Sequence, residues 1–444
     1  MAAALLPALR GLLSPGAQVV LQHDAHPEVL DFVNSPSAPA LARRGLACPD
    51  HVLYTGVKPL FLDIPPEAGR REILEQAGPA IAAYQEDYRR WFEAHSRPGD
   101  EARSALPRVA LIPGAGLVAA GRDLRSARVA RLCYRQAIKT MAGAEALGSF
   151  APLTEPEAFD IEYWPLELYK LTLAAPRGEL PGRIALVTGA AGAIGQAICR
   201  RFAEEGACVV LSDLNEQRAQ VTAEGLCQNF GSGAATAVPT DVTDEASVRR
   251  AMEHAALTYG GLDIVVCNAG IAFSHPIEET TLEEWERTMA VLSTGYFLTA
   301  REGIALMRRQ GLGGSIVFVA SKAGIAAARN ASAYASAKAA TLHLARCLAE
   351  EVSGDGIRVN CVAPDAIIQG SGLWAGQWGA ARAQAHGIPQ DRLAEFYRDR
   401  NLLKIGVTAE DVAEAALFFA SNRSRATTGA ILSVDGGLHD GYVR

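Results

Sequence analysis

Short apolar runs alternate with longer amphipathic stretches from Leu180 to the end of the chain. Such runs are typical of strands buried on both faces, as in parallel sheets that are covered by helices. A helix ended by glycine is predicted over 194–206, between the first two of these runs. The pattern therefore predicts an α/β fold with a doubly wound parallel (Rossmann) sheet. Its predicted strands are residues 183–189, 207–213, 236–242, 262–270, 315–321, 357–364 and 430–437.

The region before Leu180 shows no regular repeat and is rich in Pro, Arg and aromatic residues. Its pattern predicts a mixed α/β domain. The apolar start of the chain lacks a basic segment and a clear cleavage site, so a helix is favoured over a signal peptide. The other predicted elements are strands at 17–24 and 108–116 and helices at 75–95 and 122–147.

The residue pattern changes at the boundary between the two regions. Residues 173–183 contain two prolines and two glycines, which favours a linker. A chain of 444 residues is long enough for two domains. We therefore expect one domain over residues 1–176 and a second over residues 177–444.

Composition limits the classes of partner. Charged residues make up 20% of the chain, and the formal net charge of −7 is spread without a block of like charge. This argues against nucleic acid or an acidic membrane surface as partner. No apolar run reaches the length of about 18 residues that a membrane span needs. The eight cysteines fit no zinc or disulfide framework, so free thiols in a reducing, cytoplasmic compartment are expected.

A glycine-rich turn follows the first strand of the second region. This turn, TGAAGAIG (188–195), opens the next predicted helix. Glycines let the backbone approach a pyrophosphate there, and a helix N-terminus supplies free N–H groups. Asp213 ends the second strand, where a carboxylate accepts from ribose hydroxyls and repels a 2′-phosphate, which favours NAD. A purely structural turn, and Asp213 acting only as a helix cap, are the alternatives.

Two further strand ends carry polar residues. Asp241 ends the third strand and is placed either to reach the adenine edge or to cap the next helix. Asn268-Ala269-Gly270 ends the fourth strand, at the edge where open parallel sheets bind ligands.

The helical stretch ASAYASAKAATLHLA (331–345) carries a phenol and an amine among small, apolar residues. Four residues apart, Tyr334 and Lys338 lie on one face of the helix. A nearby ammonium lowers the pKa of a phenol, which is about 10 in water, and suits the pair to proton transfer. Ser321 ends the fifth strand, where its hydroxyl can hold a substrate oxygen. An incidental surface pair is the alternative.

Together, TGAAGAIG, CNAG, Ser321, YASAK and RVNCVAP resemble the short-chain dehydrogenase/reductase family over about residues 180–437. The resemblance implies that Tyr334 is the acid/base, Ser321 polarises the substrate oxygen, and Lys338 binds the nicotinamide ribose and lowers the tyrosine pKa. It also implies an alcohol or carbonyl substrate and a homodimer or homotetramer. The implied NAD-binding residues are Gly189, Ala193, Ile194, Gly195, Asp213, Leu214, Asp241, Val242, Asn268, Ala269, Gly270, Tyr334, Lys338, Pro364 and Ile367.

Three positions depart from the pattern of this family. Ala193 replaces the middle glycine of the turn, and Pro364-Asp365 replaces the usual Pro-Gly. Leu292 stands where the family carries an asparagine that supports a water in the proton relay. Leucine cannot do this, so either Ser293 holds a water instead or the relay runs differently. A non-catalytic NAD-binding protein is therefore an alternative to an enzyme.

A narrower resemblance is to fused class II aldolase/short-chain dehydrogenase proteins of the rhamnulose-phosphate aldolase/alcohol dehydrogenase type. It rests on residues 48–61, 108–130, 159–171, 364–374 and 393–421. We expect the zinc-bearing aldolase module to be absent, and residues 1–176 to form a degenerate, non-catalytic aldolase-like domain. His23, Asp24 and His26 are nevertheless a candidate metal cluster, which leaves a metal-dependent aldolase as another alternative.

Residues 365–405 are the variable substrate lid that the family resemblance implies. Five rings in it either stack on the substrate or pack the lid onto the sheet, namely Trp374, Trp378, His386, Phe396 and Tyr397. Lys322, Gln369 and Trp374 are the candidate substrate contacts. We expect an NAD-dependent oxidoreductase that interconverts a secondary alcohol and its carbonyl form, with a sugar, polyol or small hydroxy-carbonyl compound as substrate and no metal.

Overall fold

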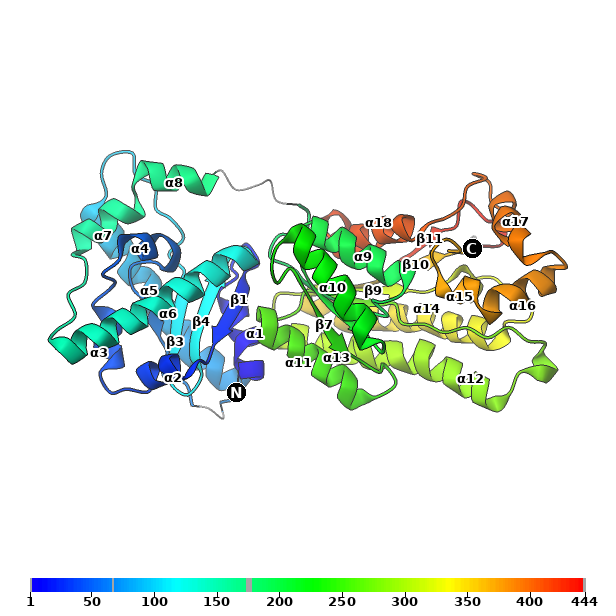
Figure 1. Cartoon of the computed structure of the whole chain (residues 1–444), viewed down its shortest axis with the longest axis horizontal. Coiled ribbons are helices and arrows are strands. Elements are labelled where there is room, and N and C mark those ends of the chain that lie inside the picture. The colour runs from blue at the N-terminus through cyan, green and yellow to red at the C-terminus, as the bar shows by residue number, and fades with distance from the viewer. Residues whose placement is uncertain (1, 66–67, 173–177, 442–444) are drawn as a thin grey trace. The chain divides into compact units, whose positions relative to one another are not determined.

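The computed structural model describes residues 2–65, 68–172 and 178–441. The chain divides into two compact units (Figure 1). The first comprises Met1–Arg177, Ala256–Gly261 and Arg309–Gly311, and the second comprises Gly178–Ala255, Leu262–Arg308 and Leu312–Arg444. Residues 173–177 of the predicted linker lie outside the described residues.

The second unit is built on a seven-stranded sheet in which all neighbouring strands are parallel. Its strands are β5 (Ile184–Thr188), β6 (Cys208–Asp213), β7 (Ala235–Pro239), β8 (Ile264–Cys267), β9 (Gly314–Val319), β10 (Ile357–Pro364) and β11 (Ile431–Val434). Their order is β11-β10-β9-β8-β5-β6-β7, so the order reverses between β5 and β8. This confirms the predicted doubly wound parallel sheet, which binds ligands at the carboxyl ends of its strands beside such a reversal.

Several strands end earlier than the apolar pattern predicts. The run predicted at 262–270 ends as a strand at Cys267. Asn268 and Ala269 leave the ladder because both donate their N–H groups to Thr188 Oγ1, at 2.9 and 3.1 Å. The Thr188 side chain, at the end of β5, therefore holds the segment after β8 at the edge of the sheet where ligands bind.

Helices cover both faces of the parallel sheet. They are α9 (Ala193–Glu204), α10 (Glu216–Phe230), α11 (Glu245–Tyr259), α12 (Leu282–Met289), α13 (Gly295–Gln310), α14 (Ser332–Val352), α15 (Gly372–Ala375), α16 (Gln377–His386), α17 (Leu393–Arg400) and α18 (Ala409–Ala420). A π-helical turn, Ala290–Thr294, joins α12 to α13. The helices α15, α16 and α17 lie together beyond the sheet (Figure 1) and have a small apolar core of their own.

The first unit contains a mixed four-stranded sheet of order β1-β4-β3-β2. The strands are β1 (Val20–Asp24), β2 (Leu60–Phe61), β3 (Val109–Ile112) and β4 (Gly116–Gly121). Its helices are α1 (Ala2–Leu12), α2 (Pro27–Val33), α3 (Ala38–Arg43), α4 (Pro49–Thr55), α5 (Arg70–His95), α6 (Leu124–Leu147), α7 (Glu155–Glu162) and α8 (Pro165–Thr172). The sequence pattern predicted β1, β3, α1, α5 and α6 but missed the short elements between them.

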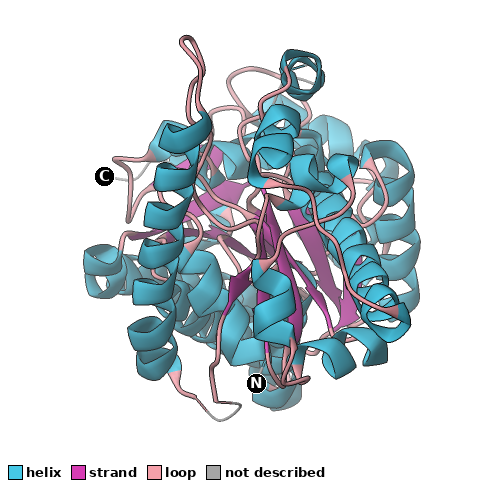
Figure 2. Ribbon diagram, turned by 90° about the vertical axis from the view of Figure 1, so that its left-hand side faces the viewer, coloured by secondary structure: helices cyan, strands magenta, loops and turns pink. Residues whose placement is uncertain are grey.

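The cores follow from these layers. The strands run through the interior and the helices lie outside them (Figure 2). In the second unit Val187, Val209 and Val266 are fully buried against Phe202 of α9 and Leu417 of α18. Across residues 2–65, 68–172 and 178–441, no helix is both long and apolar enough to cross a membrane.

Candidate active site

The glycine-rich turn after β5 is built by close backbone packing. Gly189 has φ +63°, and a Cβ placed there would lie 2.7 Å from Ala269 Cα. A Cβ on Gly195 would lie 2.3 Å from the Gly189 carbonyl oxygen. Gly192 is the N-cap of α9. Ala193, which replaces the middle glycine of the family pattern, is therefore the first residue of the helix and lies after the turn. The turn therefore presents the N-terminus of α9 at the open edge of the sheet, as phosphate binding requires.

Two side chains hold this turn in place. The Asn268 amide donates to the Thr188 and Gly189 carbonyl oxygens at 3.0 and 3.1 Å. Asp213 Oδ2 accepts from the Ala191 N–H at 2.8 Å, and its Oδ1 accepts from the Asn215 N–H at 2.8 Å. Asp213 thus supports the turn and the start of α10 together, which is more than the simple cap considered from sequence.

A cavity of about 600 Å³ joins the turn to the lid. Thirteen of the residues predicted for the site line it: Gly189, Ala193, Ile194, Asp213, Asn268, Gly270, Ser321, Lys322, Tyr334, Lys338, Pro364, Ile367 and Trp374. The wall of the cavity does not include Gly195, Leu214, Asp241, Val242, Ala269 or Gln369. The fold therefore brings the glycine-rich turn and the tyrosine helix to a single cavity.

The structure also describes the surroundings of three predicted residues outside the wall. Leu214 is 74% exposed. Asp241 Oδ1 accepts from the backbone and hydroxyl of Thr243 at 2.9 and 2.7 Å, in the loop before α11, whereas Asp244 accepts from the first N–H groups of that helix, so the capping alternative for Asp241 is wrong. A Cβ on Gly295 would lie 2.9 Å from Val242, so Val242 packs against the start of α13. None of these three residues lines the cavity.

Tyr334 is half-buried at the cavity, and Ser321 lines the same wall beside it. Burial raises the pKa of the Tyr334 phenol above its ordinary value, and the Asp365 carboxylate raises it further. The hydrogen bond from Ser321 acts in the opposite direction. The resemblance implied that Lys338 lowers the pKa of Tyr334. In this structure burial raises that pKa instead, and the Lys338 ammonium is held by other groups.

The Lys338 ammonium points into the unit rather than at the phenol. It donates to the Val319 carbonyl oxygen at 2.6 Å and to the Tyr296 hydroxyl at 3.1 Å. It lies 6.0 Å from the centre of the Tyr334 ring. Burial lowers the pKa of Lys338 to about 7. Sequence reasoning missed Tyr296, although its place four residues after Leu292 puts it one turn further along the same helical segment.

Leu292 lies within the π-helical turn and is fully buried at the cavity wall. Its carbonyl oxygen accepts from Thr341 Oγ1 at 2.8 Å, which ties the turn to α14. The Ser293 hydroxyl, considered from sequence as a substitute for asparagine, donates to the Ala337 carbonyl oxygen at 3.4 Å. The side chain that contacts Lys338 in this part of the chain is therefore Tyr296 and not residue 292 or 293.

Rings of the lid continue from the phenol. The Trp378 ring centre lies 5.3 Å from that of Tyr334 and 6.1 Å from that of Trp374. Trp374 in turn lies 5.2 Å from Tyr397. Trp374, Trp378 and Tyr397 line the cavity, whereas Phe396 packs within the lid against His386 at 4.6 Å. Trp374, Trp378 and Tyr397 are therefore placed to contact a substrate, whereas Phe396 packs the lid.

The candidate metal residues of the first unit do not form a cluster. Asp24 pairs with Arg131 at 3.2 Å, and His23 Nε2 lies 2.7 Å from the Ala115 carbonyl oxygen. His26 lies 3.6 Å from Glu28. Nowhere in the described ranges do three or more His, Cys, Asp or Glu side chains converge as metal ligands.

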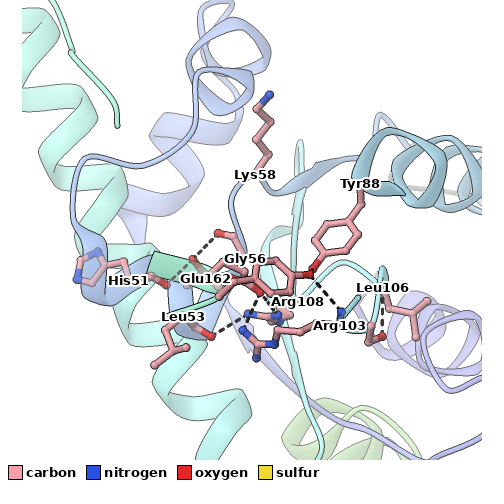
Figure 3. A network of polar contacts seen from close by, with 12 residues as sticks. His51, Leu53, Gly56, Lys58, Tyr88, Arg103, Leu106, Arg108 and Glu162 are labelled. Carbon is pink, nitrogen blue, oxygen red and sulfur yellow. Dashed lines mark hydrogen bonds and ion pairs between the residues drawn. The ribbon is translucent and has the colours of Figure 1, made fainter. Parts of the chain in front are cut away.

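The polar centre of the first unit is a buried carboxylate. Glu162 Oε1 accepts from Arg103 at 2.7 Å and from Arg108 at 2.6 Å (Figure 3). Arg108 also donates to the Leu53 carbonyl oxygen at 2.8 Å. This network joins α7, β3 and the end of α4, so it ties the helices of the unit to its sheet.

Comparison with known proteins identifies the two parts of the chain. Residues 189–439 match the family model described as enoyl-(acyl carrier protein) reductase, and residues 1–171 match the second domain of class II aldolases. The whole chain is 47% identical over 443 residues to an uncharacterized oxidoreductase, YuxG, of Bacillus subtilis, and it spans 64% of that protein's length.

Two characterised proteins are similar to the second unit alone. D-threitol dehydrogenase of Mycolicibacterium smegmatis is 36% identical over 258 residues, which cover 58% of this chain and 93% of that protein. Sorbitol-6-phosphate 2-dehydrogenase SrlD of Erwinia amylovora is 30% identical, with a TM-score of 0.56 over 59% of this chain and 100% of that one. The chain belongs to the short-chain dehydrogenase/reductase family of oxidoreductases and carries an aldolase-like domain before the dehydrogenase domain.

Proposed function

We propose that the protein is an NAD-dependent dehydrogenase that interconverts a secondary alcohol and its carbonyl form. The observation that carries this proposal is that Ser321 and Tyr334 line one cavity together with the glycine-rich turn, with the serine hydroxyl close enough to affect the pKa of the phenol. A hydroxyl and a phenol at that place suit the two needs of the reaction, which are to hold the substrate oxygen and to exchange its proton.

The residues present fit a nicotinamide dinucleotide. The α9 N-terminus and the close packing at Gly189 suit a pyrophosphate, and Ile367 is buried at the wall near the other end of the cavity. When bound, the cofactor accepts or supplies the hydride of the reaction. The proposed preference for NAD over NADP rests on Asp213, because this acidic residue lines the cavity beside the turn.

The chain's own residues divide the remaining work. Ser321 holds the substrate oxygen, and Tyr334 receives the hydroxyl proton during oxidation or returns it during reduction. Lys338 supplies a positive charge next to the site. Its ammonium is held by hydrogen bonds to the Val319 carbonyl oxygen and the Tyr296 hydroxyl. The lid rings of Trp374 and Trp378 exclude water and contact the substrate.

The substrate class follows from the relatives. D-threitol dehydrogenase, a glucose 1-dehydrogenase of Gluconobacter oxydans and sorbitol-6-phosphate 2-dehydrogenase are named for polyols, a sugar and a sugar phosphate. We extend this to a polyol, sugar or small hydroxy-carbonyl substrate here. In the same proposal residues 1–176 are a non-catalytic domain, residues 177–444 carry the dehydrogenase, and the protein works as a homodimer or homotetramer in the cytoplasm, where its eight free thiols stay reduced.

A non-catalytic NAD-binding protein is the second candidate, because Leu292 removes a group that supports the relay in this family. The contact between Tyr296 and Lys338 favours the enzyme, since it gives the lysine another hydrogen-bonding partner.

The test is a screen for NAD reduction across sugars, polyols, hydroxy acids and other secondary alcohols, with Ser321→Ala beside the wild type. We expect turnover of at least one polyhydroxy compound and a loss of about 100-fold or more in kcat for the variant. Tyr54→Phe, in the first unit, is the control and should retain full activity. NADH binding without turnover of any compound would favour the non-catalytic protein.

A further inference from the structure

Basic side chains gather at the lid end of the cavity. Lys322, Arg329, Arg382 and Arg400 all line it. Lys322 follows Ser321 directly, whereas the three arginines come from the loop before α14 and from α16 and α17. Lys322 and Arg382 are only 7% and 6% exposed. Buried positive charges at a cavity wall are costly unless an anion or strong acceptors compensate them.

No carboxylate compensates these charges as an ion pair. Arg382 donates to the Arg329 carbonyl oxygen and to the Tyr397 hydroxyl, and it contacts His386 at 3.2 Å, all neutral partners. Arg400 lies over the Phe396 and Tyr397 rings, at 5.6 and 5.2 Å from their centres. Within residues 2–65, 68–172 and 178–441, none of the four basic side chains forms an ion pair.

The carboxylates of the same wall are Asp365 and Asp440, besides Asp213 at the glycine-rich turn. Asp365 lies in the field of Lys322, Arg400 and Arg382, but burial still raises its pKa above the ordinary value. The same basic groups, after burial, lower the pKa of His386 to about 4, so its imidazole adds no further charge. Four basic side chains thus meet two carboxylates in this part of the lining, which leaves an excess of positive charge.

The charges stand at a defined place relative to the phenol. The Trp378 ring lies 5.3 Å from the Tyr334 ring, and the Arg382 guanidinium lies 5.6 Å from the centre of Trp378. A substrate whose hydroxyl reaches Ser321 and Tyr334 would extend past Trp378 toward these cations. Guanidinium groups bind phosphate and carboxylate through charge-assisted hydrogen bonds, which suits them to the far end of such a molecule.

We infer that the substrate is an anionic alcohol, with a phosphate monoester or carboxylate that Lys322, Arg382 and Arg400 bind at the end remote from the reacting carbon. This inference rests on the proposed function for the reaction at Ser321 and Tyr334. It goes further by assigning the lid an anion-binding site and by excluding neutral polyols as the preferred substrates.

The test compares matched compounds of three chain lengths, each as neutral polyol, carboxylate and phosphate. Glycerol, glycerate and glycerol phosphate form one set, and the corresponding threitol and sorbitol compounds form the others. NAD reduction gives kcat and KM, and quenching of tryptophan fluorescence gives binding without turnover, since Trp374 and Trp378 line the cavity. The preference between carboxylate and phosphate identifies the anion.

The variants are Lys322→Met and Arg400→Gln, with Arg398→Gln as control. Arg398 lies on the same helix as Arg400 but is outside the cavity and paired with Asp399 at 3.0 Å. We expect each cavity variant to raise KM, and the dissociation constant from fluorescence, about 10-fold or more for the anionic compounds. Binding of the neutral compounds should change much less than binding of the anionic ones, and the control should match the wild type for both.

Two results separate the inference from the proposed function. Equal binding of neutral and anionic compounds, unaffected by Lys322→Met and Arg400→Gln, would overturn the anion site while alcohol oxidation stands. Selective anion binding that the variants abolish, without NAD reduction by any compound, would support the anion site and count against the dehydrogenase.

Discussion

Tyr296 Oη lies 3.1 Å from the Lys338 ammonium and itself donates to the Val319 carbonyl oxygen at 2.7 Å. Both side chains are almost completely buried, at 1% and 4% exposure. The ammonium also lies 4.9 Å from the centre of the Tyr296 ring. The chain thus places a second tyrosine beside the lysine of the proposed proton-transfer site, four residues after Leu292.

Tyr296→Phe tests whether this contact positions Lys338. The hydroxyl accepts from the ammonium, so its removal should destabilise the charged lysine and lower its pKa below about 7. We expect kcat to fall about 10-fold, with the corresponding limb of the pH profile moved to lower pH and KM little changed. Adding Leu292→Asn to this variant should restore part of the activity. An unchanged pH profile would leave Tyr296 with a packing role alone.

The buried lysine also predicts how stability depends on pH. Burial lowers the pKa of folded Lys338 to about 7, whereas an unfolded lysine titrates at about 10.4. Between these values the unfolded chain binds more protons, so the contribution of Lys338 to stability rises with pH and is lost as pH falls toward 7. The contribution of Lys338 to the free energy of unfolding changes by at most about 1.4 kcal/mol per pH unit.

Lys338→Met isolates this contribution. Denaturant unfolding of the variant and the wild type, measured from pH 7 to pH 10, should show the free-energy difference changing in favour of the wild type as pH rises. A constant difference across this range would show that Lys338 keeps an ordinary pKa in the folded protein.

Asp213 should set the choice between the two nicotinamide dinucleotides. Its carboxylate lies at the cavity wall together with Arg218, a cation that sequence reasoning overlooked. Asp213→Asn removes the repulsion of a 2′-phosphate and leaves Arg218 to attract it, so the ratio of NADP to NAD efficiency should rise at least about 10-fold. Asp241→Asn, outside the cavity, should leave the ratio unchanged. A wild type that prefers NADP would contradict the assignment.

The buried Glu162 should control the stability of the first unit. Glu162→Gln leaves Arg103 and Arg108 without their shared carboxylate, and breaking a buried ion pair costs about 3–5 kcal/mol. Hydrogen exchange of the β3 and α7 amides measures this locally. Glu155→Gln, on the same helix, breaks only an exposed pair with Lys58 and should cost about 1 kcal/mol or less. Similar losses for both variants would contradict the role of burial.

The sequence predicted the second unit well because its strands are continuous apolar runs and its turns carry glycine or a polar residue at fixed places. It predicted less of the first unit, where β2 has only two residues and β4 both starts and ends at a glycine. Gly116 at that start has φ +108°, and a Cβ there would lie 2.3 Å from the Asp24 carbonyl oxygen. That packing depends on a strand far away in the sequence.

The candidate site shows the same limit. Spacing placed Tyr334, Lys338 and Ser321 together because helix periodicity and strand ends are local features. The direction of the Lys338 side chain depends on Tyr296 and Val319, which only the fold brings near. The basic side chains of the lid are likewise spread over Lys322, Arg382 and Arg400, so their convergence is a property of the tertiary structure.

The most direct measurement of the central claim is the kcat of Tyr334→Phe on the best substrate of the wild type, with NADH binding followed by fluorescence. The variant keeps the ring beside Trp378 and loses only the hydroxyl that Ser321 contacts. We predict a fall in kcat of about 100-fold or more with NADH affinity retained. Turnover equal to the wild type would contradict the assignment of Tyr334 as the proton-transfer residue.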